Sequence, residues 1–304
     1  MKNPGWVDLQ VNGHNNVDYS DANLTEENFI KSAEALIDSG TDIFLPTIIT
    51  NDIARMRRNA ALIRNAVEKY ALGDHIPGVH FEGPFISPTP GAVGAHDPKC
   101  VLPPTPENIA ALLDDNEGFV KIVTLGADTA NAAGAIAEIK KRGIVVSVGH
   151  HMADFAQVRA AADAGAQLLT HLGNGCPNQL DRHVNPVYAG MAEPRLSAML
   201  ITDGHHLPGD LVKLFIKVKG VDKVIVTSDA SSLTGLPPGE YRTLGNRAVL
   251  YPSGKLYNPD KCCLVGSAST ISMCMAFLES LGVLSEAELI KVGRSNALQV
   301  LGKN

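Results

Sequence analysis

The sequence predicts an α/β fold, a (β/α)8 TIM barrel, and two patterns carry this prediction. Eight short apolar runs alternate with amphipathic segments, and the runs are continuously apolar, as in parallel strands covered on both faces. Polar side chains suited to metal binding or proton transfer directly follow several runs, which is typical of the C-terminal ends of barrel strands. A chain of 304 residues can hold one such barrel or two ordinary domains. We predict a single barrel domain over 1–304, in preference to a doubly wound sheet.

The expected helices begin and end at recognisable residues. Thr25 is placed to cap the first helix, Glu26 and Glu27 suit its first turn, and Gly40 ends it. A helix capped by Thr105 begins after the third strand. The other helices before the last strand are expected over 52–70, 131–142, 155–164 and 208–219. The eight strands are expected over 6–11, 42–50, 76–82, 120–126, 144–149, 166–170, 197–202 and 223–228.

Two segments interrupt this alternation. The connection 83–104 is long and rich in Pro and Gly, and a loop of that size in a compact domain is often functional. After the eighth strand, residues 233–264 contain short alternating runs separated by a Pro-Ser-Gly turn. They predict a small β-hairpin excursion. Two helices, over about 267–280 and 285–301, are expected to end the chain.

The composition describes a folded protein with a large core. Hydrophobic residues make up 45% of the chain and charged residues 19%. No apolar run has the length of a membrane span, and the N-terminus lacks a secretory signal, so we expect no membrane partner. The net charge of −6 argues against nucleic-acid binding. Five scattered cysteines without a C-x-x-C pair favour reduced thiols and a cytoplasmic location.

Glu82 is the residue around which the candidate site is organised. It ends the third apolar run, and a Gly-Pro pair then turns the backbone so that the carboxylate faces a cavity. His150, His171 and Asp229 stand at the ends of three later runs. Imidazole and carboxylate groups hold divalent cations in proteins. The residues alone therefore predict a metal-dependent hydrolase with Glu82 as its first ligand.

Each of these residues also has a structural interpretation. Glu82 could be a cap or half of an ion pair, the two histidines could be hydrogen-bonded core residues, and Asp229 could cap a following segment. The functional interpretation is favoured because all of the candidates occupy strand ends, where a barrel gathers its functional groups.

Four motifs stand at the ends of the expected strands: Phe81-Glu82-Gly83-Pro84, Gly149-His150, Thr170-His171-Leu172 with Asn174, and Ser228-Asp229-Ala230. They resemble those of the N-acetylglucosamine-6-phosphate deacetylases of the amidohydrolase superfamily. The resemblance covers nearly the whole chain, and the order, spacing and strand-end placement of the motifs agree. Other superfamily members usually have His-x-His near the end of the first strand, whereas this chain has Gln10-Val11-Asn12, which is similar to the deacetylases.

The resemblance implies roles for individual residues. Glu82, His150 and His171 would bind one divalent metal ion, zinc ahead of iron, cobalt or manganese. Asp229 would act as general base and then general acid, and His206 would polarise the substrate carbonyl. The residues that the resemblance implies for substrate binding are Gln10, His96, Asn174, Gly175, Arg182, His206, Val265, Gly266 and Ser267.

Three features depart from the family pattern. The chain starts at the first strand and stops soon after Asn296-Ala297, so we expect the family's small β-sandwich to be absent or vestigial. His151 and Met152 replace a usual pair of small polar residues, and His205 is an additional histidine beside His206.

The function that the resemblance implies is removal of the N-acetyl group from an N-acetyl hexosamine 6-phosphate, with release of acetate. N-acetylglucosamine-6-phosphate is the first candidate, and Arg182 would hold its phosphate in a bidentate grip. The partner is then a phosphorylated amino sugar, and a homodimer stays open. One alternative is a deacylase of another N-acyl sugar or N-acyl amino acid. The other is a barrel that binds an amino-sugar phosphate without turning it over.

Overall fold

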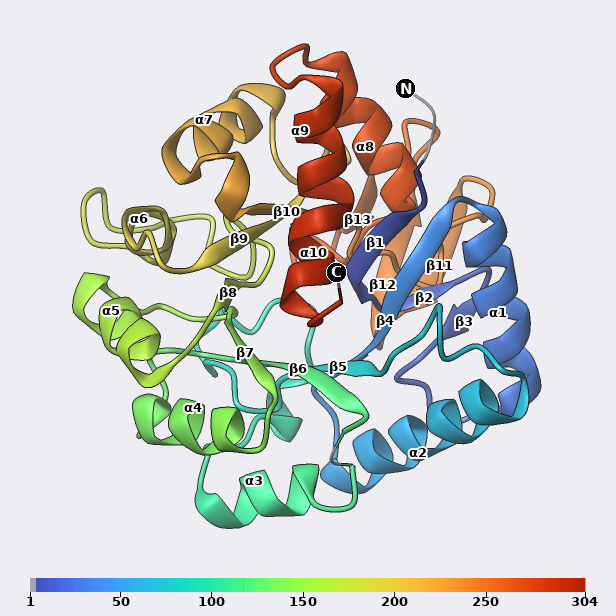
Figure 1. Cartoon of the computed structure of the whole chain (residues 1–304), viewed down its shortest axis with the longest axis horizontal. Helices are drawn as coiled ribbons and strands as arrows, with labels where there is room; N and C mark the ends of the chain where they lie inside the picture. Colours follow the sequence, from blue (N-terminus) through green and yellow to red (C-terminus); the bar gives the residue numbers. More distant parts are fainter. Residues whose placement is uncertain (1–3, 117, 304) are drawn as a thin grey trace.

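Eight parallel strands form a barrel surrounded by helices (Figure 1). The computed structural model describes residues 4–116 and 118–303. Neighbours in the sheet follow the order of the chain, as successive βα units require, and this confirms the predicted (β/α)8 fold. The barrel strands are β1 (Trp6–Val11), β4 (Thr41–Ile49), β5 (Val79–Glu82), β6 (Val120–Leu125), β7 (Val145–Val148), β8 (Leu168–Leu169), β9 (Ser197–Ile201) and β10 (Val224–Thr227).

The helices begin close to the residues that the sequence indicates. Thr25 caps the first helix by accepting a hydrogen bond from the Asn28 backbone N–H. Helix α6 was not predicted, although Asn185 caps it and Pro186 begins it, because its seven residues show too little periodicity. The helices are α1 (Glu26–Asp38), α2 (Ile53–Lys69), α3 (Pro106–Leu113), α4 (Ala132–Lys141), α5 (Phe155–Ala164), α6 (Pro186–Ala192), α7 (Gly209–Lys219), α8 (Ile271–Ser280), α9 (Glu286–Ile290) and α10 (Asn296–Val300).

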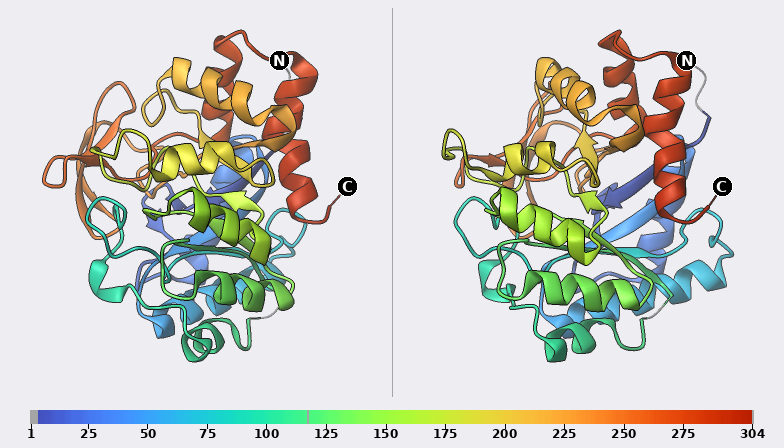
Figure 2. Two further views of the ribbon diagram at one scale, coloured as in Figure 1. Left: turned by 90° about the vertical axis from the view of Figure 1, so that its left-hand side faces the viewer. Right: turned by 60° about the vertical axis from the view of Figure 1, so that its left-hand side comes forward.

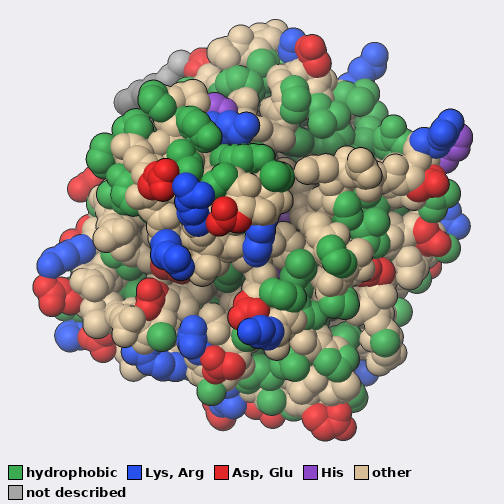
Figure 3. All heavy atoms as spheres, turned by 180° about the vertical axis from the view of Figure 1, so that it is seen from behind, with side chains coloured by type: hydrophobic (Ala, Val, Ile, Leu, Met, Phe, Trp, Pro, Cys, Tyr) green, Lys and Arg blue, Asp and Glu red, His purple; other side chains and the backbone are tan. Residues whose placement is uncertain are grey.

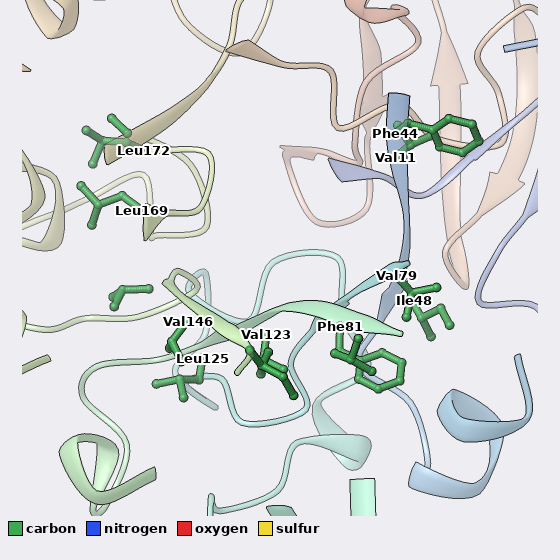
Figure 4. Packing of buried hydrophobic residues seen from close by; sticks show 14 of the residues in the cluster. Val11, Phe44, Ile48, Val79, Phe81, Val123, Leu125, Val146, Leu169 and Leu172 are labelled. Atoms are coloured by element: carbon green, nitrogen blue, oxygen red, sulfur yellow. The ribbon is translucent and has the colours of Figure 1, made fainter. Parts of the chain in front are cut away.

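Two hydrophobic clusters account for most of the buried apolar side chains of the barrel. The larger one lies between strands and helices, and Figure 4 shows part of it, with Ile48, Val79 and Phe81 of neighbouring strands packed together. The smaller one contains residues of six strands, and Ala297 of α10 belongs to it. The apolar interior explains why the strands are continuously apolar in sequence.

The barrel closes between β1 and β10 through few backbone contacts. The Asn12 backbone N–H donates to the Ala230 carbonyl at 2.7 Å, and the Asp229 N–H donates to the Gln10 carbonyl at 3.1 Å. The buried Asp8 carboxylate adds to this closure, since it accepts hydrogen bonds from the Thr227 hydroxyl at 2.7 Å and from the Ser228 backbone N–H at 3.1 Å. Burial outweighs these bonds and raises the pKa of Asp8 to about 6.

The raised pKa of Asp8 predicts a specific pH dependence of stability. A carboxyl with a higher pKa in the folded chain favours folding below its unfolded pKa of about 4, and this contribution is lost as the pH rises to about 6. For Asp8 the loss is about 3 kcal/mol. The free energy of unfolding, measured with denaturant from pH 4 to 7, should fall by this amount in the natural protein but not in Asp8→Asn. The control Asp74→Asn, at an exposed position, should show the same fall as the natural protein. Parallel profiles for the natural protein and Asp8→Asn would contradict the assignment.

The excursion after β10 is larger than the predicted hairpin. It is a four-stranded antiparallel sheet with its own small core around Leu233, Ala248, Leu250 and Leu256. This sheet lies at the opposite end of the barrel from the described ends of the chain, on the same side as the 83–104 loop (Figure 2). Its strands are β11 (Gly239–Thr243), β12 (Asn246–Leu250), β13 (Leu256–Asn258) and β14 (Cys263–Leu264).

A second short hairpin, β2 (Gly13–His14) and β3 (Val17–Asp18), follows β1. In the described part of the chain, no helix has both the length and the apolar character that crossing a membrane requires.

Candidate metal and hydrolytic site

Glu82, His150 and His171 come together at the C-terminal ends of β5, β7 and β8. One ligand atom of each lies within 4.8 Å of the other two. His171 Nε2 is 2.9 Å from Glu82 Oε1 and 3.0 Å from His150 Nε2, and His150 Nε2 is 3.2 Å from the same carboxylate oxygen. All three side chains are buried. This is a group that could hold a divalent metal ion.

The protonation of the cluster fits a cation between its members. His150 Nδ1 lies 2.7 Å from the Ala92 carbonyl oxygen, which can only accept, so Nδ1 carries the proton and Nε2 offers a lone pair to the cluster. Burial opposes the charge on Glu82, but the hydrogen bonds of His150 and His171, together with the charge of His150, outweigh it and hold the pKa of Glu82 well below its usual value. An ionised carboxylate and two imidazole nitrogens therefore converge on one point.

The backbone adopts an unusual conformation at three of the residues that the sequence placed in the site. His150, His171 and Asp229 all have positive φ, at 50°, 29° and 52°. Residues other than glycine rarely adopt this left-handed region, and such strain gathers at functional sites. Gly175 lies so close that a Cβ atom there would be 3.0 Å from His171 Cε1 and 3.1 Å from His150 Nδ1. The chain is thus bent to bring these side chains together.

Asp229 lies beside the cluster and shares a hydrogen-bond donor with it. Gln10 Nε2 donates to Glu82 Oε1 at 2.8 Å and to Asp229 Oδ1 at 3.0 Å, while Asn12 Nδ2 donates to Asp229 Oδ1 at 2.7 Å. Burial, and after it the charge of Glu82, raises the pKa of Asp229. A carboxylate with a raised pKa is suited to accept and return a proton near neutral pH.

Gln10 positions both carboxylates, so its loss should impair the site without removing a ligand. Gln10→Met keeps a similar shape but has no N–H to hold Glu82 and Asp229. Changes to groups that orient metal ligands typically cost about 10- to 100-fold in metal affinity or activity, and we expect a fall in that range. Metal titration and turnover should be measured together. Unchanged values for both would contradict the positioning role.

His206 also lines the cavity, and Asp203 holds its ring in place. Its Nδ1 lies 2.8 Å from Asp203 Oδ2, which also accepts from the Ser267 hydroxyl at 3.2 Å. Burial alone would raise the pKa of Asp203, but the hydrogen bond and charge of His206 outweigh it and hold that pKa well below its usual value. His205 differs from its neighbour, since its Nε2 lies 2.9 Å from the Ser253 carbonyl and so contacts the excursion.

His96 brings the long 83–104 loop into the site. Its Nε2 lies 3.2 Å from His150 Nε2 and 3.6 Å from Glu82 Oε2, and its Nδ1 lies 2.8 Å from the Thr50 hydroxyl. Burial, followed by the charge of His150, lowers the pKa of His96 to about 3, so this ring is neutral.

A cavity of about 400 Å³ opens beside these residues. Several predicted substrate contacts line it, but Gln10, Val265 and Ser267 are not among the lining residues. Val265 is buried, and the Ser267 hydroxyl donates to Asp203. Arg182 is exposed on the loop between β8 and α6 and is not among the lining residues. Its predicted grip on phosphate therefore stays a prediction without support from this geometry. The predicted residues that line the cavity are Glu82, His96, His150, His171, Asn174, Gly175, His206, Asp229 and Gly266.

Other lining residues, Asn12 and three residues of the excursion among them, were not predicted from the sequence. Asn12 donates a hydrogen bond to Asp229. Its place in the Gln10-Val11-Asn12 segment at the end of the first strand was a sequence signal for a role in the site. The excursion supplies Leu244, Cys263 and Leu264, for which no sequence signal existed because tertiary folding alone places the sheet there. Burial raises the pKa of the Cys263 and Cys176 thiols, so both cysteines that line the cavity are neutral at pH 7.

The chain is similar to known proteins along most of its length. The model of the amidohydrolase family matches residues 1–236. The N-acetylglucosamine-6-phosphate deacetylase of Danio rerio is 31% identical over 310 residues, which cover 98% of this chain and 75% of that protein. The N-acetylgalactosamine-6-phosphate deacetylase of Escherichia coli O157:H7 is 26% identical over 299 residues, which cover 98% of this chain and 78% of the relative.

A solved structure agrees with these relatives. The crystal structure of N-acetyl-D-glucosamine-6-phosphate deacetylase from Mycobacterium smegmatis is 27% identical, with a TM-score of 0.89, over 99% of this chain and 78% of that one. The chain therefore belongs to the amidohydrolase family and, within it, to the N-acetylglucosamine-6-phosphate deacetylases.

Proposed function

We propose that this chain hydrolyses the acetamide of an N-acetyl hexosamine 6-phosphate, with N-acetylglucosamine-6-phosphate as the first candidate, and releases acetate. The observation that carries the proposal is the convergence of Glu82, His150 and His171 beside Asp229 at one cavity. The names of the Danio rerio and Mycobacterium smegmatis proteins support the choice of substrate.

Glu82, His150 and His171 would hold one divalent ion. When bound, such an ion acts as a Lewis acid and lowers the pKa of water towards 7. Asp229 takes the proton of the attacking water and returns it to the leaving amine nitrogen, so it serves as base and then as acid. Gln10 and Asn12 keep its carboxylate in place through both steps.

His206 would face the substrate carbonyl. Its Nδ1 is fixed on Asp203, which leaves Nε2 to donate to the carbonyl oxygen when the ring carries both protons. A fixed donor aimed at the oxygen that becomes negative stabilises the tetrahedral intermediate without reorganisation. Asn174 and Gly175 line the cavity where the sugar would lie.

We further propose zinc as the resident ion, ahead of iron, cobalt or manganese. Two imidazoles and one carboxylate, with a further position left for water, are a common ligand set of catalytic zinc. The same ligands accept the other metals, so supply in the cell contributes to the choice. The five free cysteines fit a reducing, cytoplasmic location.

A second candidate substrate is N-acetylgalactosamine-6-phosphate, which the Escherichia coli O157:H7 relative favours by its name. The two sugars differ at one hydroxyl. Acetate release should be compared for both phosphorylated sugars, for N-acetylglucosamine and for an N-acetyl amino acid. We expect the highest kcat/KM with N-acetylglucosamine-6-phosphate. A higher value for a compound that is not an amino sugar would overturn the proposal.

A further inference from the structure

A layer of polar side chains lies inside the barrel, between the metal cluster and an apolar floor. The floor is the smaller hydrophobic cluster, which includes Ile122 of β6 and Leu168 of β8. Side chains alternate in direction along a strand, so Thr124 and Thr170, two residues further on, face the interior again. Both hydroxyls are buried, and buried polar groups need hydrogen-bond partners.

Four side chains of this layer form one unbroken chain of hydrogen bonds. His80 Nδ1 lies 3.0 Å from the Leu9 carbonyl oxygen, and His80 Nε2 lies 2.7 Å from the Thr124 hydroxyl. The Thr124 hydroxyl is 2.7 Å from that of Thr170, which is 2.5 Å from that of Ser147. We call these four residues, His80, Thr124, Ser147 and Thr170, the interior network.

The direction of the bonds follows from the end of the chain at Leu9. A carbonyl oxygen can only accept, so His80 Nδ1 carries a proton. Burial lowers the pKa of His80 to about 4, so the ring is neutral and its Nε2 accepts. Thr124 therefore donates to His80, and Thr170 donates to Thr124. Ser147 in turn donates to Thr170, so each hydroxyl proton of the network has an acceptor.

The network adjoins His150 and His171 through the backbone. Thr170 directly precedes His171 in the chain, and Gly149 directly precedes His150. A Cβ atom on Gly149 would lie 2.6 Å from Thr170 Cβ and 3.1 Å from Thr124 Cγ2. The backbone before His150 therefore rests against two members of the network. His150 and His171 both have positive φ, and such strain persists only where the surrounding structure fixes it.

Glu82 is adjacent to the same network. It stands two residues after His80 in β5, so the two side chains face the same side of the strand. It is also the register neighbour of Thr124 in β6, and the Gly83 backbone N–H donates to the Thr124 carbonyl at 2.9 Å. All three residues of the metal cluster thus adjoin one hydrogen-bonded unit.

We propose that the interior network positions Glu82, His150 and His171 for the metal ion, with Thr170 as its central member. This rests on the proposed function, because it assigns further residues to the same site. Thr170 makes two of the bonds of the network and directly precedes His171. The four side chains are at most 3% exposed and lie beneath the hollowed surface seen in Figure 3, and none of them lines the cavity. They are therefore positioning residues that act on the cluster through the barrel backbone.

The zinc affinity of Thr170→Val tests this role. Valine keeps the shape of threonine but has no hydroxyl, so the bonds to Thr124 and Ser147 are lost. Affinity is measured on the purified, folded protein by competition for zinc with a chelator of known strength. We expect a fall of about 10- to 100-fold, the usual cost of losing a group that orients metal ligands. Thr170→Ser keeps the hydroxyl and should recover most of the affinity.

Ser147→Ala and Thr41→Val complete the test. Ser147 is the first donor of the chain, so Ser147→Ala breaks only one bond and should lower zinc affinity by about 2- to 10-fold. Thr41 is also buried, but in residues 4–116 and 118–303 its hydroxyl has no hydrogen-bond partner, so Thr41→Val is a matched control that should keep the natural affinity. Natural affinity in folded Thr170→Val would overturn the role, as would natural affinity in Ser147→Ala if Thr170→Val does not fold.

Acetate release and the free energy of unfolding are measured on the same samples. A merely structural role would lower the free energy of unfolding but leave the zinc affinity of the folded variants unchanged. If the natural protein binds zinc and releases no acetate, but Thr170→Val binds zinc more weakly as expected, the hydrolytic function fails and the positioning role stands. If acetate is released and the variants bind zinc like the natural protein, the function stands and the positioning role is wrong.

Discussion

Replacing Asp229 with Asn is expected to lower acetate release by about 10²- to 10⁴-fold, the usual contribution of a general acid–base group. The Asn side chain keeps the oxygen that accepts from Gln10 and Asn12, so the geometry is retained. It cannot take the proton of the attacking water. The loss should therefore fall on kcat, with the metal content unchanged.

The control for Asp229→Asn is Asp74→Asn, at an exposed position in the turn before β5. It makes the same chemical change at a residue that does not line the cavity, and we expect natural activity from it. Turnover of Asp229→Asn above about a tenth of the natural rate, with metal bound, would show that another group moves the proton.

Replacing His171 with Asn is expected to remove most of the bound metal and to lower acetate release by about 100-fold or more. Altering a group that merely orients a ligand already costs up to that amount, and His171 is itself a member of the cluster. The shorter side chain cannot bring a nitrogen to the point where His150 Nε2 and Glu82 Oε1 meet. Elemental analysis of the purified variant measures the metal directly.

The matched control is His183→Asn, a histidine exposed on the loop before α6. It should keep the natural metal content and the natural rate of acetate release from N-acetylglucosamine-6-phosphate. If His171→Asn binds metal with the stoichiometry of the natural protein, the assignment of His171 as a ligand is wrong.

Much of the fold could be predicted from the sequence because the barrel is built from local signals. The apolar strands and the capping residues, such as Thr25 and Thr105, lie within each element, and the structure places them as expected. Helix α6 and strand β14 were missed because they are short, and short elements depend on their surroundings more than on their own periodicity.

The site could be predicted only as far as strand ends reveal it. Glu82, His150, His171 and Asp229 each follow an apolar run, so topology alone brings them to one face. Contacts made by loops could not be derived in this way. Arg182 was expected at the phosphate but is exposed outside the lining of the cavity. The lining residues Leu244, Cys263 and Leu264 come from a segment whose position depends on how the excursion folds back over the barrel.

The most direct test of the central claim is acetate release from N-acetylglucosamine-6-phosphate by the purified protein, with metal quantified in the same sample. The proposal predicts about one divalent ion per chain, loss of turnover on chelation, and recovery when zinc or another divalent ion is added back. Turnover that persists after the metal has been removed would contradict it, as would the absence of turnover with one ion bound per chain.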